Sequence, residues 1–214
     1  GEKDACGVGF VANVEGIESN WILKQSLKGL NCMEHRGGCG GDSDSGDGAG
    51  ILCSIPWGYL EEKINLKNTQ EFNRGLGMVF MPNKKEKIEI CKSICDEEAE
   101  KLKVNKTSWR TVPVNNEILG PLAKANAPFI CQWILYIDKK DHKDVERLLF
   151  QLRKRIEKKI RETFKNDVGD CEFYFASLSS QTVVYKGMVR SEILSEFYQD
   201  LKEESFKVSF SVYH

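Results

Sequence analysis

A cysteine near the start of the chain, in Cys6-Gly7-Val8-Gly9-Phe10, is the residue best placed to do chemistry. If residues 1–5 are removed, Cys6 carries a thiol nucleophile and an α-amino base on the same residue. The unperturbed pKa of such an amine is about 7.7–8.0, which suits proton transfer near neutral pH, whereas the same nitrogen in a peptide bond is not basic. We therefore expect residues 1–5 to be a leader and 6–214 the working domain. From spacing alone, an inert thiol remains the alternative.

The glycines that follow Cys6 have two interpretations. Residues 7–12 match the loose dinucleotide pattern G-x-G-x-x-A, but that pattern requires a strand before it and a helix starting on it. The segment Gly1–Ala5 before Cys6 is polar in character and too short for such a strand. We therefore expect Gly7 and Gly9 to let backbone amides approach a substrate beside Cys6, as an oxyanion hole requires.

Arg36 precedes Gly37-Gly38 at the end of an apolar helical pattern. An arginine there offers a rigid fork of donors to the surroundings of the nucleophile. A surface salt bridge explains the same position equally well by spacing alone.

A metal-binding module is the alternative from a different functional class. Its ligands would come from the acidic loop Asp42–Asp47 or from the cluster Cys32, His35, Cys39 and Cys53. The loop lacks the glycine and glutamate positions of an EF-hand, and the cluster lacks paired C-x-x-C knuckles. We therefore expect no metal site.

Composition narrows the class of protein. The 214 residues are 41% hydrophobic and 29% charged with a formal net charge of −1, which is typical of an ordinary globular protein. The basic run over 153–161 is interrupted by glutamate and has no aromatic platform, so we expect no nucleic-acid partner. No apolar run approaches the roughly 18–20 residues that span a bilayer, and no secretion signal is recognisable. The expected location is the cytoplasm, or a plastid if the source is a photosynthetic eukaryote.

Eight cysteines are irregularly spaced in a chain that does not need disulfide staples, so reduced thiols are expected. Cys91 and Cys95 share one helical face with Ile88, Ala99 and Leu102, which predicts core packing. A redox pair is the minor alternative.

Apolar spacing predicts an α+β chain. Strands are expected over 8–14, 49–55, 77–81, 109–114, 129–137 and 206–213, and helices over 19–36, 84–103, 141–160 and 191–201. The segments 173–178 and 182–189 are expected to pair as a hairpin. The order has no regular βα repeat, so antiparallel sheets covered by helices are favoured over a doubly wound parallel sheet.

Several motifs together resemble one family. These are Cys6-Gly7-Val8-Gly9-Phe10, Cys32-Met33-Glu34-His35-Arg36-Gly37-Gly38, Asp44-Ser45-Gly46-Asp47-Gly48-Ala49-Gly50, Ile55-Pro56-Trp57, Trp109-Arg110-Thr111-Val112-Pro113-Val114, Ser177-Leu178-Ser179-Ser180 and Val184-Tyr185-Lys186-Gly187. In this order along the whole chain, they are similar to the glutaminase domain of glutamate synthases.

The resemblance implies a class II glutamine amidotransferase of the N-terminal nucleophile hydrolase superfamily, a four-layer αββα sandwich of antiparallel sheets. It implies that Cys6 attacks the side-chain amide of glutamine to give a γ-glutamyl thioester and ammonia, and that water then releases glutamate. Arg36 matches the arginine that the family keeps near the nucleophile, and Gly7 and Gly37 are expected to support it.

The resemblance also implies a larger parent protein. Family members continue after the position of His214 into segments that clamp glutamine and complete the oxyanion hole, so the sandwich is expected to be incomplete on its C-terminal side and these 214 residues inactive alone. Ammonia would pass to a synthase region that aminates 2-oxoglutarate with FMN and an iron-sulfur cluster. No cofactor is expected in this chain, and an NAD(P)H-dependent subunit or ferredoxin would supply electrons to the parent.

Overall fold

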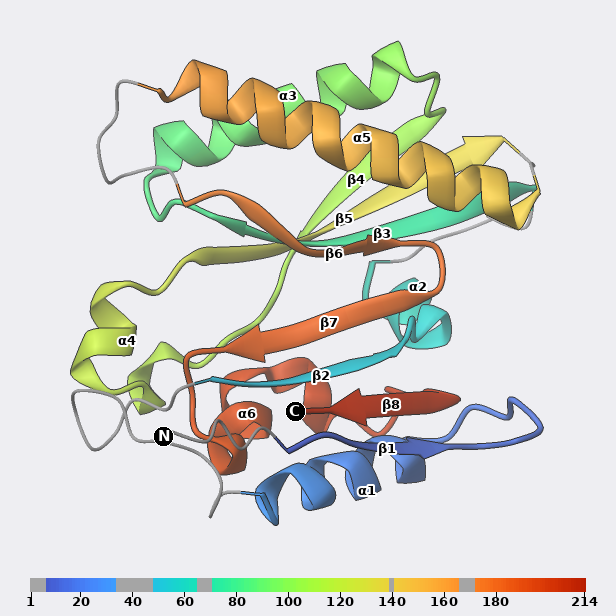
Figure 1. Cartoon of the computed structure of the whole chain (residues 1–214), viewed down its shortest axis with the longest axis vertical. Helices are drawn as coiled ribbons and strands as arrows, with labels where there is room; N and C mark the ends of the chain where they lie inside the picture. The colour runs from blue at the N-terminus through green and yellow to red at the C-terminus, as the bar shows by residue number, and fades with distance from the viewer. Residues whose placement is uncertain (1–6, 34–47, 65–70, 139–140, 166–171) are drawn as a thin grey trace, which may run out of the picture. The chain divides into compact units, whose positions relative to one another are not determined.

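The computed structural model describes residues 7–33, 48–64, 71–138, 141–165 and 172–214, and these form two compact units, each built from separate stretches of the chain (Figure 1). Unit 1 comprises Gly1–Asn65, Pro113–Ala127 and Val184–His214. Unit 2 comprises Leu66–Val112 and Pro128–Val183.

The sheet of unit 1 has four strands in the order β1-β8-β2-β7. The bounds are Gly9–Ala12 for β1, Phe210–Tyr213 for β8, Ala49–Ser54 for β2 and Thr182–Gly187 for β7. Strand β8 is antiparallel to both β1 and β2, so the last described strand lies between the first two. Helix α1, Asn20–Asn31, packs against β1 and β8.

Helix α1 begins where the sequence predicts, but contacts with residues distant in the sequence hold its start in place of a side-chain cap. Ser19 is its N-cap residue, yet the Ser19 side chain makes no capping hydrogen bond. Instead, the Ser19 backbone forms a bridge with Val208, and Asn20 Nδ2 donates to the carbonyl oxygens of Glu203 and Phe206. The helix ends at Asn31, earlier than the expected end after Arg36.

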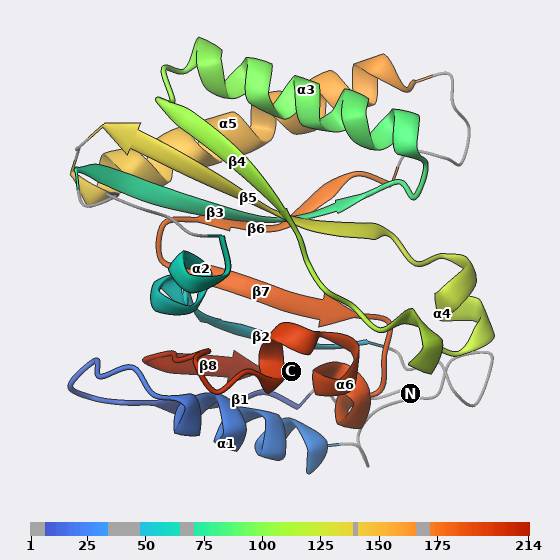
Figure 2. The same ribbon diagram turned by 180° about the vertical axis from the view of Figure 1, so that it is seen from behind.

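The sheet of unit 2 has the order β4-β5-β3-β6, and each adjacent pair is antiparallel. Its strands are β4 (Lys106–Thr111), β5 (Phe129–Asp138), β3 (Phe72–Met81) and β6 (Tyr174–Ser179). Helices α3, Lys85–Lys101, and α5, His142–Thr163, lie together over one face of this sheet, as Figures 1 and 2 both show.

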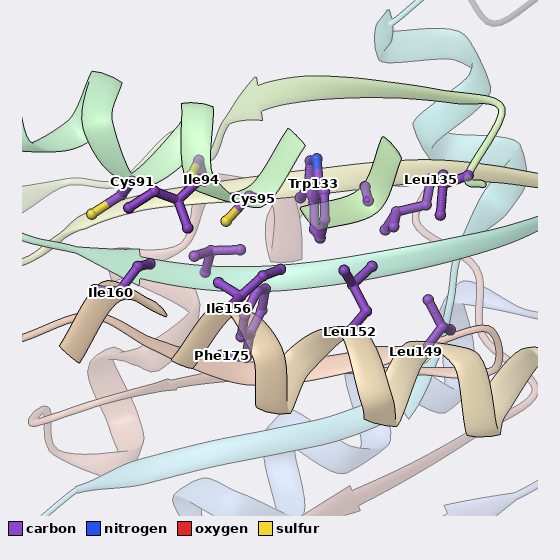
Figure 3. Close-up of a cluster of buried hydrophobic side chains, with 14 of the residues drawn as sticks. Cys91, Ile94, Cys95, Trp133, Leu135, Leu149, Leu152, Ile156, Ile160 and Phe175 are labelled. Carbon is purple, nitrogen blue, oxygen red and sulfur yellow. The ribbon is translucent and has the colours of Figure 1, made fainter. Parts of the chain in front are cut away.

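The core of unit 2 lies between these helices and the sheet. Every third or fourth residue of α5 from Val145 to Ile160 is buried, and Asp141 caps the helix by accepting a hydrogen bond from Lys143 N at 3.0 Å. In Figure 3 the apolar side chains of α5 gather with those of α3 and β5. Cys91 and Cys95 belong to this cluster and are fully buried, which confirms their predicted packing role.

The remaining elements are short. They are α2 (Trp57–Ile64), α4 (Pro121–Ala125), α6 (Leu194–Phe197) and the 3₁₀ turns Asn116–Ile118, Ser191–Ile193 and Gln199–Lys202. The single helix predicted over 191–201 is therefore wrong, because this stretch is three short pieces.

The described elements confirm the α+β class with antiparallel sheets. The predicted hairpin is wrong, because β6 pairs with β3 while β7 neighbours β2 in the other sheet. Between them, Glu146 Oε1 of α5 accepts hydrogen bonds from Ser180 N at 2.6 Å and Ser180 Oγ at 2.7 Å. These hydrogen bonds tie the connection between β6 and β7 to helix α5. The chain therefore passes from one sheet to the other at this point, and β6 and β7 do not form a hairpin.

Candidate active site

The predicted site residues fall mainly outside the described part of the chain. Cys6, Arg36 and Gly37 lie there, as do His35, Cys39 and the loop Asp42–Asp47. Gly7 is described, and it is a half-buried residue just before β1. Residues 7–12, 29–33 and 48–50, which flank these site residues in the sequence, are described.

Those flanking segments converge at one end of the unit 1 sheet. Tyr213 at the end of β8 pairs with Gly9 at the start of β1 on one side and with Ile51 of β2 on the other. Gly50 and His214 exchange backbone hydrogen bonds of 2.9 and 3.0 Å beside this pair. Figure 1 shows the start of β1, the start of β2 and the end of α1 at this same end of unit 1.

The Tyr213 ring fills the space between two glycines. A Cβ built on Gly9 would lie 2.3 Å from Tyr213 Cζ, and a Cβ built on Gly29 of α1 would lie 2.4 Å from Tyr213 Oη. Real Cβ atoms essentially never come so close, so both positions exclude any side chain while the ring is there. The packing of the Tyr213 ring therefore explains why residue 9 is glycine, without any approach of a substrate to the backbone.

The motif that ends in Gly48-Ala49-Gly50 contacts the motif Val184-Tyr185-Lys186-Gly187, because strands β2 and β7 are neighbours in the sheet. A Cβ built on Gly50 would lie 2.9 Å from Lys186 Cβ, and one on Gly48 would lie 3.5 Å from the Gly187 carbonyl oxygen. Gly48 also has a φ of +123°, a conformation that residues with side chains rarely adopt. The glycines of Gly48-Ala49-Gly50 thus fit against the strand that carries Tyr185-Lys186-Gly187.

Strand β7 is held there by buried tyrosines. The Asp200 carboxylate, fully buried, accepts hydrogen bonds from Tyr59 Oη at 2.8 Å and Tyr185 Oη at 3.2 Å. Tyr198 Oη donates to the Lys186 carbonyl oxygen at 2.7 Å. The role of Asp200 was not predicted, because a single acidic residue in a polar stretch gives no sign that two distant tyrosines will reach it.

The alternative zinc cluster is not supported by its two described members. Cys32 is exposed just after α1, whereas Cys53 is fully buried on β2. Burial raises the pKa of Cys53, which disfavours the thiolate that zinc requires. Among the residues that the structure describes, no three His, Cys, Asp or Glu side chains are grouped as a metal ion would require. Within the same ranges, no helix has both the length and the apolar content to cross a membrane.

Comparison with known families identifies the family of this chain. A profile of the family described as "Glutamine amidotransferases class-II" matches residues 6–214. The match takes in all but the first five residues, and the chain belongs to this family. Membership does not support the alternative of a metal-binding module.

Individual relatives of the chain have names more specific than the family description. The chloroplastic ferredoxin-dependent glutamate synthase of Oryza sativa subsp. japonica is 43% identical over 217 residues. Ferredoxin-dependent glutamate synthase 1 of Arabidopsis thaliana is 42% identical and ferredoxin-dependent glutamate synthase 2 of Synechocystis sp. is 43% identical, each over 217 residues. Each alignment covers the whole chain, and the chain spans 13% of the length of each of these relatives.

Proposed function

We propose that this chain is the glutaminase part of a ferredoxin-dependent glutamate synthase, with Cys6 as nucleophile. The observation that carries the proposal is the start of the family match at Cys6, together with the convergence of the flanking segments at Tyr213. Residues 6–214 would form the working domain, and Gly1–Ala5 a leader whose removal frees the α-amino group of Cys6.

In the proposed reaction the Cys6 thiolate adds to the side-chain amide carbon of glutamine. The carbon–nitrogen bond breaks, the α-amino group of Cys6 delivers a proton to the leaving nitrogen, and ammonia departs from a γ-glutamyl thioester. Water, deprotonated by the same amine, then cleaves the thioester to glutamate and the free thiol. Gly7 and Gly37 would supply backbone near the developing oxyanion, and Arg36 a fixed positive charge beside the nucleophile.

The ammonia would serve a synthase region that aminates 2-oxoglutarate. FMN and an iron-sulfur cluster would belong to that region. Within the described part of this chain, no three His, Cys, Asp or Glu side chains are grouped as metal ligation would require. The names of the relatives favour ferredoxin as the electron donor and do not support the NAD(P)H-dependent subunit. Two of those names also indicate a chloroplast, which supports a plastid location where the source is photosynthetic.

The test transplants the chain into a whole enzyme. Residues 6–214 replace the matching segment of the rice relative, and glutamate release from glutamine is measured with Cys6 as the first residue, with residues 1–5 retained, and with Cys6→Ser. We expect turnover from the first form, background from Cys6→Ser, and a loss of about 10²–10⁴-fold where mass spectrometry shows residues 1–5 still attached. Equal activity of the Cys6→Ser form would refute the proposed nucleophile.

A further inference from the structure

The outward side of helix α5 carries a row of positive charge. Its apolar side lies against the unit 2 sheet, where Leu149, Leu152 and Ile156 belong to the buried cluster (Figure 3). On the opposite side, exposed cations recur at helical spacings of three, four or seven residues: Lys143, Arg147, Lys154, Lys158 and Arg161. Phe150 fills the seven-residue gap, and these six side chains are called the basic row below.

Charge is unevenly divided between this helix and the rest of the chain. Residues 142–163 include eight Lys or Arg and four Asp or Glu, a net charge of +4, whereas the whole chain has a formal net charge of −1. The rest of the sequence therefore carries a net charge of −5. A helix of 22 residues is about 33 Å long, so the basic row can contact a partner segment over several turns.

The cations of the basic row are only weakly engaged within the chain. Carboxylate oxygens of α5 lie 3.4, 3.3 and 3.9 Å from the side-chain nitrogens of Arg147, Lys154 and Lys158. Strong charge-assisted hydrogen bonds are shorter, at about 2.7–2.9 Å. The nearest of these carboxylates, that of Glu157, is held at 2.7 Å by Arg153 outside the row. Between 60% and 77% of each of the three cationic side chains is exposed, so they are accessible to a partner.

Phe150 lies at the middle of the basic row, and 61% of it is exposed. The Lys154 Nζ lies 5.8 Å from the centroid of its ring. A single exposed phenylalanine is ordinary on a protein surface. An exposed aromatic ring with cations on both sides, however, has the arrangement of a protein–protein interface, in which an aromatic anchor is surrounded by a polar rim.

We propose that the basic row binds an acidic segment of a protein, one that presents a row of carboxylates with an apolar side chain among them. The carboxylates pair with the cations, and the apolar side chain covers Phe150. This docking surface is independent of the reaction proposed for Cys6.

The neighbours of the basic row favour a protein over other anionic partners. Three acidic residues flank the cations: Asp144, Glu157 and Glu162. They repel the uniformly negative backbone of a nucleic acid, but they can pair with cations that a protein segment carries between its carboxylates. A bilayer surface would require several apolar side chains on this side, and within α5, all of which is described, Phe150 is the only large apolar side chain that is exposed.

The experiment measures the binding of a defined acidic helix to the 214-residue chain. The probe is a fluorescein-labelled peptide of 22 residues, the length of α5, with glutamate at every third or fourth position along one face and leucine at its centre. Fluorescence anisotropy compares it with a peptide of the same composition in scrambled order. We expect the ordered peptide to bind at least about tenfold more tightly, and its affinity to fall when NaCl is raised from about 20 to about 150 mM.

Two variants remove different parts of the surface. The double variant Lys154→Glu with Lys158→Glu should weaken binding of the ordered peptide at least about tenfold, because like charges then face each other. Phe150→Ala should weaken it at least about fivefold, as loss of an aromatic anchor does. The matched control is Lys24→Glu with Lys28→Glu, which reverses two exposed lysines at the same four-residue spacing on α1. This control should bind the peptide as the unaltered chain does, to within about twofold.

The outcomes decide between the proposal and its alternatives. Equal binding of the ordered and scrambled peptides would refute it, because general attraction between opposite charges would then suffice. Unchanged affinity of Phe150→Ala, or an equal loss in the α1 control, would also refute it. Tighter binding of poly(U) RNA or of phosphatidylserine vesicles than of the ordered peptide would assign the surface to a nucleic acid or a membrane instead. Far-UV circular dichroism checks that each variant is folded, and Arg147→Glu replaces the double variant if that one is not.

Discussion

Replacing Gly9 with alanine should destabilise the protein, and removing the Tyr213 ring should cancel that cost. The new Cβ would lie 2.3 Å from Tyr213 Cζ, whereas ordinary contact begins at 3.4 Å, so strand or ring must move by the difference of 1.1 Å. The ring has no room to move toward α1, because Gly29 lies against the same edge. The backbone of Gly9 does not have a positive φ, so alanine itself is not strained there.

The magnitude follows from two opposing effects. Overpacking typically costs about 1–3 kcal/mol, and the loss of chain entropy in the unfolded state offsets about 0.4–1 kcal/mol, so Gly9→Ala should lower the free energy of unfolding by about 1–2 kcal/mol. In a Tyr213→Ala background the clash is absent, and Gly9→Ala should be neutral or stabilising. The coupling energy between the two substitutions should therefore be about 1–3 kcal/mol.

Urea titrations of the unaltered chain, both single variants and the double variant measure this coupling. Gly58→Ala is the matched control, because Gly58 lies in helix α2 of the same unit and a Cβ there meets nothing within 4 Å. It should raise stability by up to about 1 kcal/mol. A Gly9→Ala cost that is the same with and without the Tyr213 ring would refute the reasoning.

Three further perturbations test other contacts. Asp96→Asn should lower the free energy of unfolding by about 2–3 kcal/mol in urea titrations followed by tryptophan fluorescence. Asp96 Oδ1 accepts hydrogen bonds from Thr107 Oγ1 and Trp133 Nε1, while Trp109 Nε1 donates to both carboxylate oxygens and is nearer to Oδ2. An amide NH2 group in place of Oδ2 would therefore face the Trp109 N–H. Equal stability would show that these bonds contribute nothing net. Hydrogen bonds from Lys101 and then Arg155 hold the pKa of Glu98 below its usual 4.5, so their stabilisation should be present above pH 4.5 and be lost as pH falls through the lowered pKa. Glu98→Gln should flatten this part of the dependence of the urea midpoint on pH between 5 and 3, and an unchanged slope would contradict it. Burial raises the pKa of Cys53, Cys95 and Cys131, so iodoacetamide should modify these thiols only after unfolding, and adducts found by mass spectrometry in the native chain would contradict their burial.

The sequence predicted best the elements that local interactions determine. Helix α5 appears where Asp141 can cap it and where apolar residues recur from Val145 to Ile160. Strand β5 appears where a run that is apolar except for Gln132 indicates burial on both faces, and Gln132 is itself fully buried. In each case the pattern that marks the element in sequence is the pattern that buries it.

Prediction failed where distant backbone decides the conformation. The helix expected over 191–201 is interrupted at Tyr198, whose φ and ψ of −92° and 104° are extended. Phe197 O accepts from Asn115 N at 2.8 Å, and Gln199 N donates to Pro113 O at 3.1 Å. These bonds to a segment more than 80 residues earlier replace helical ones, and no local pattern signals them.

The candidate site likewise has features that the sequence predicted and features that only the tertiary structure determined. The motif around Cys6 and its order with the later motifs indicated the family, because chemistry requires particular residue types at fixed spacing. Only the tertiary structure decided that Tyr213 would lie between β1 and β2 and that its ring would require glycine at positions 9 and 29. Pairing between residues some 200 positions apart depends on how the whole unit packs, and a glycine in sequence does not reveal which neighbour will need its space.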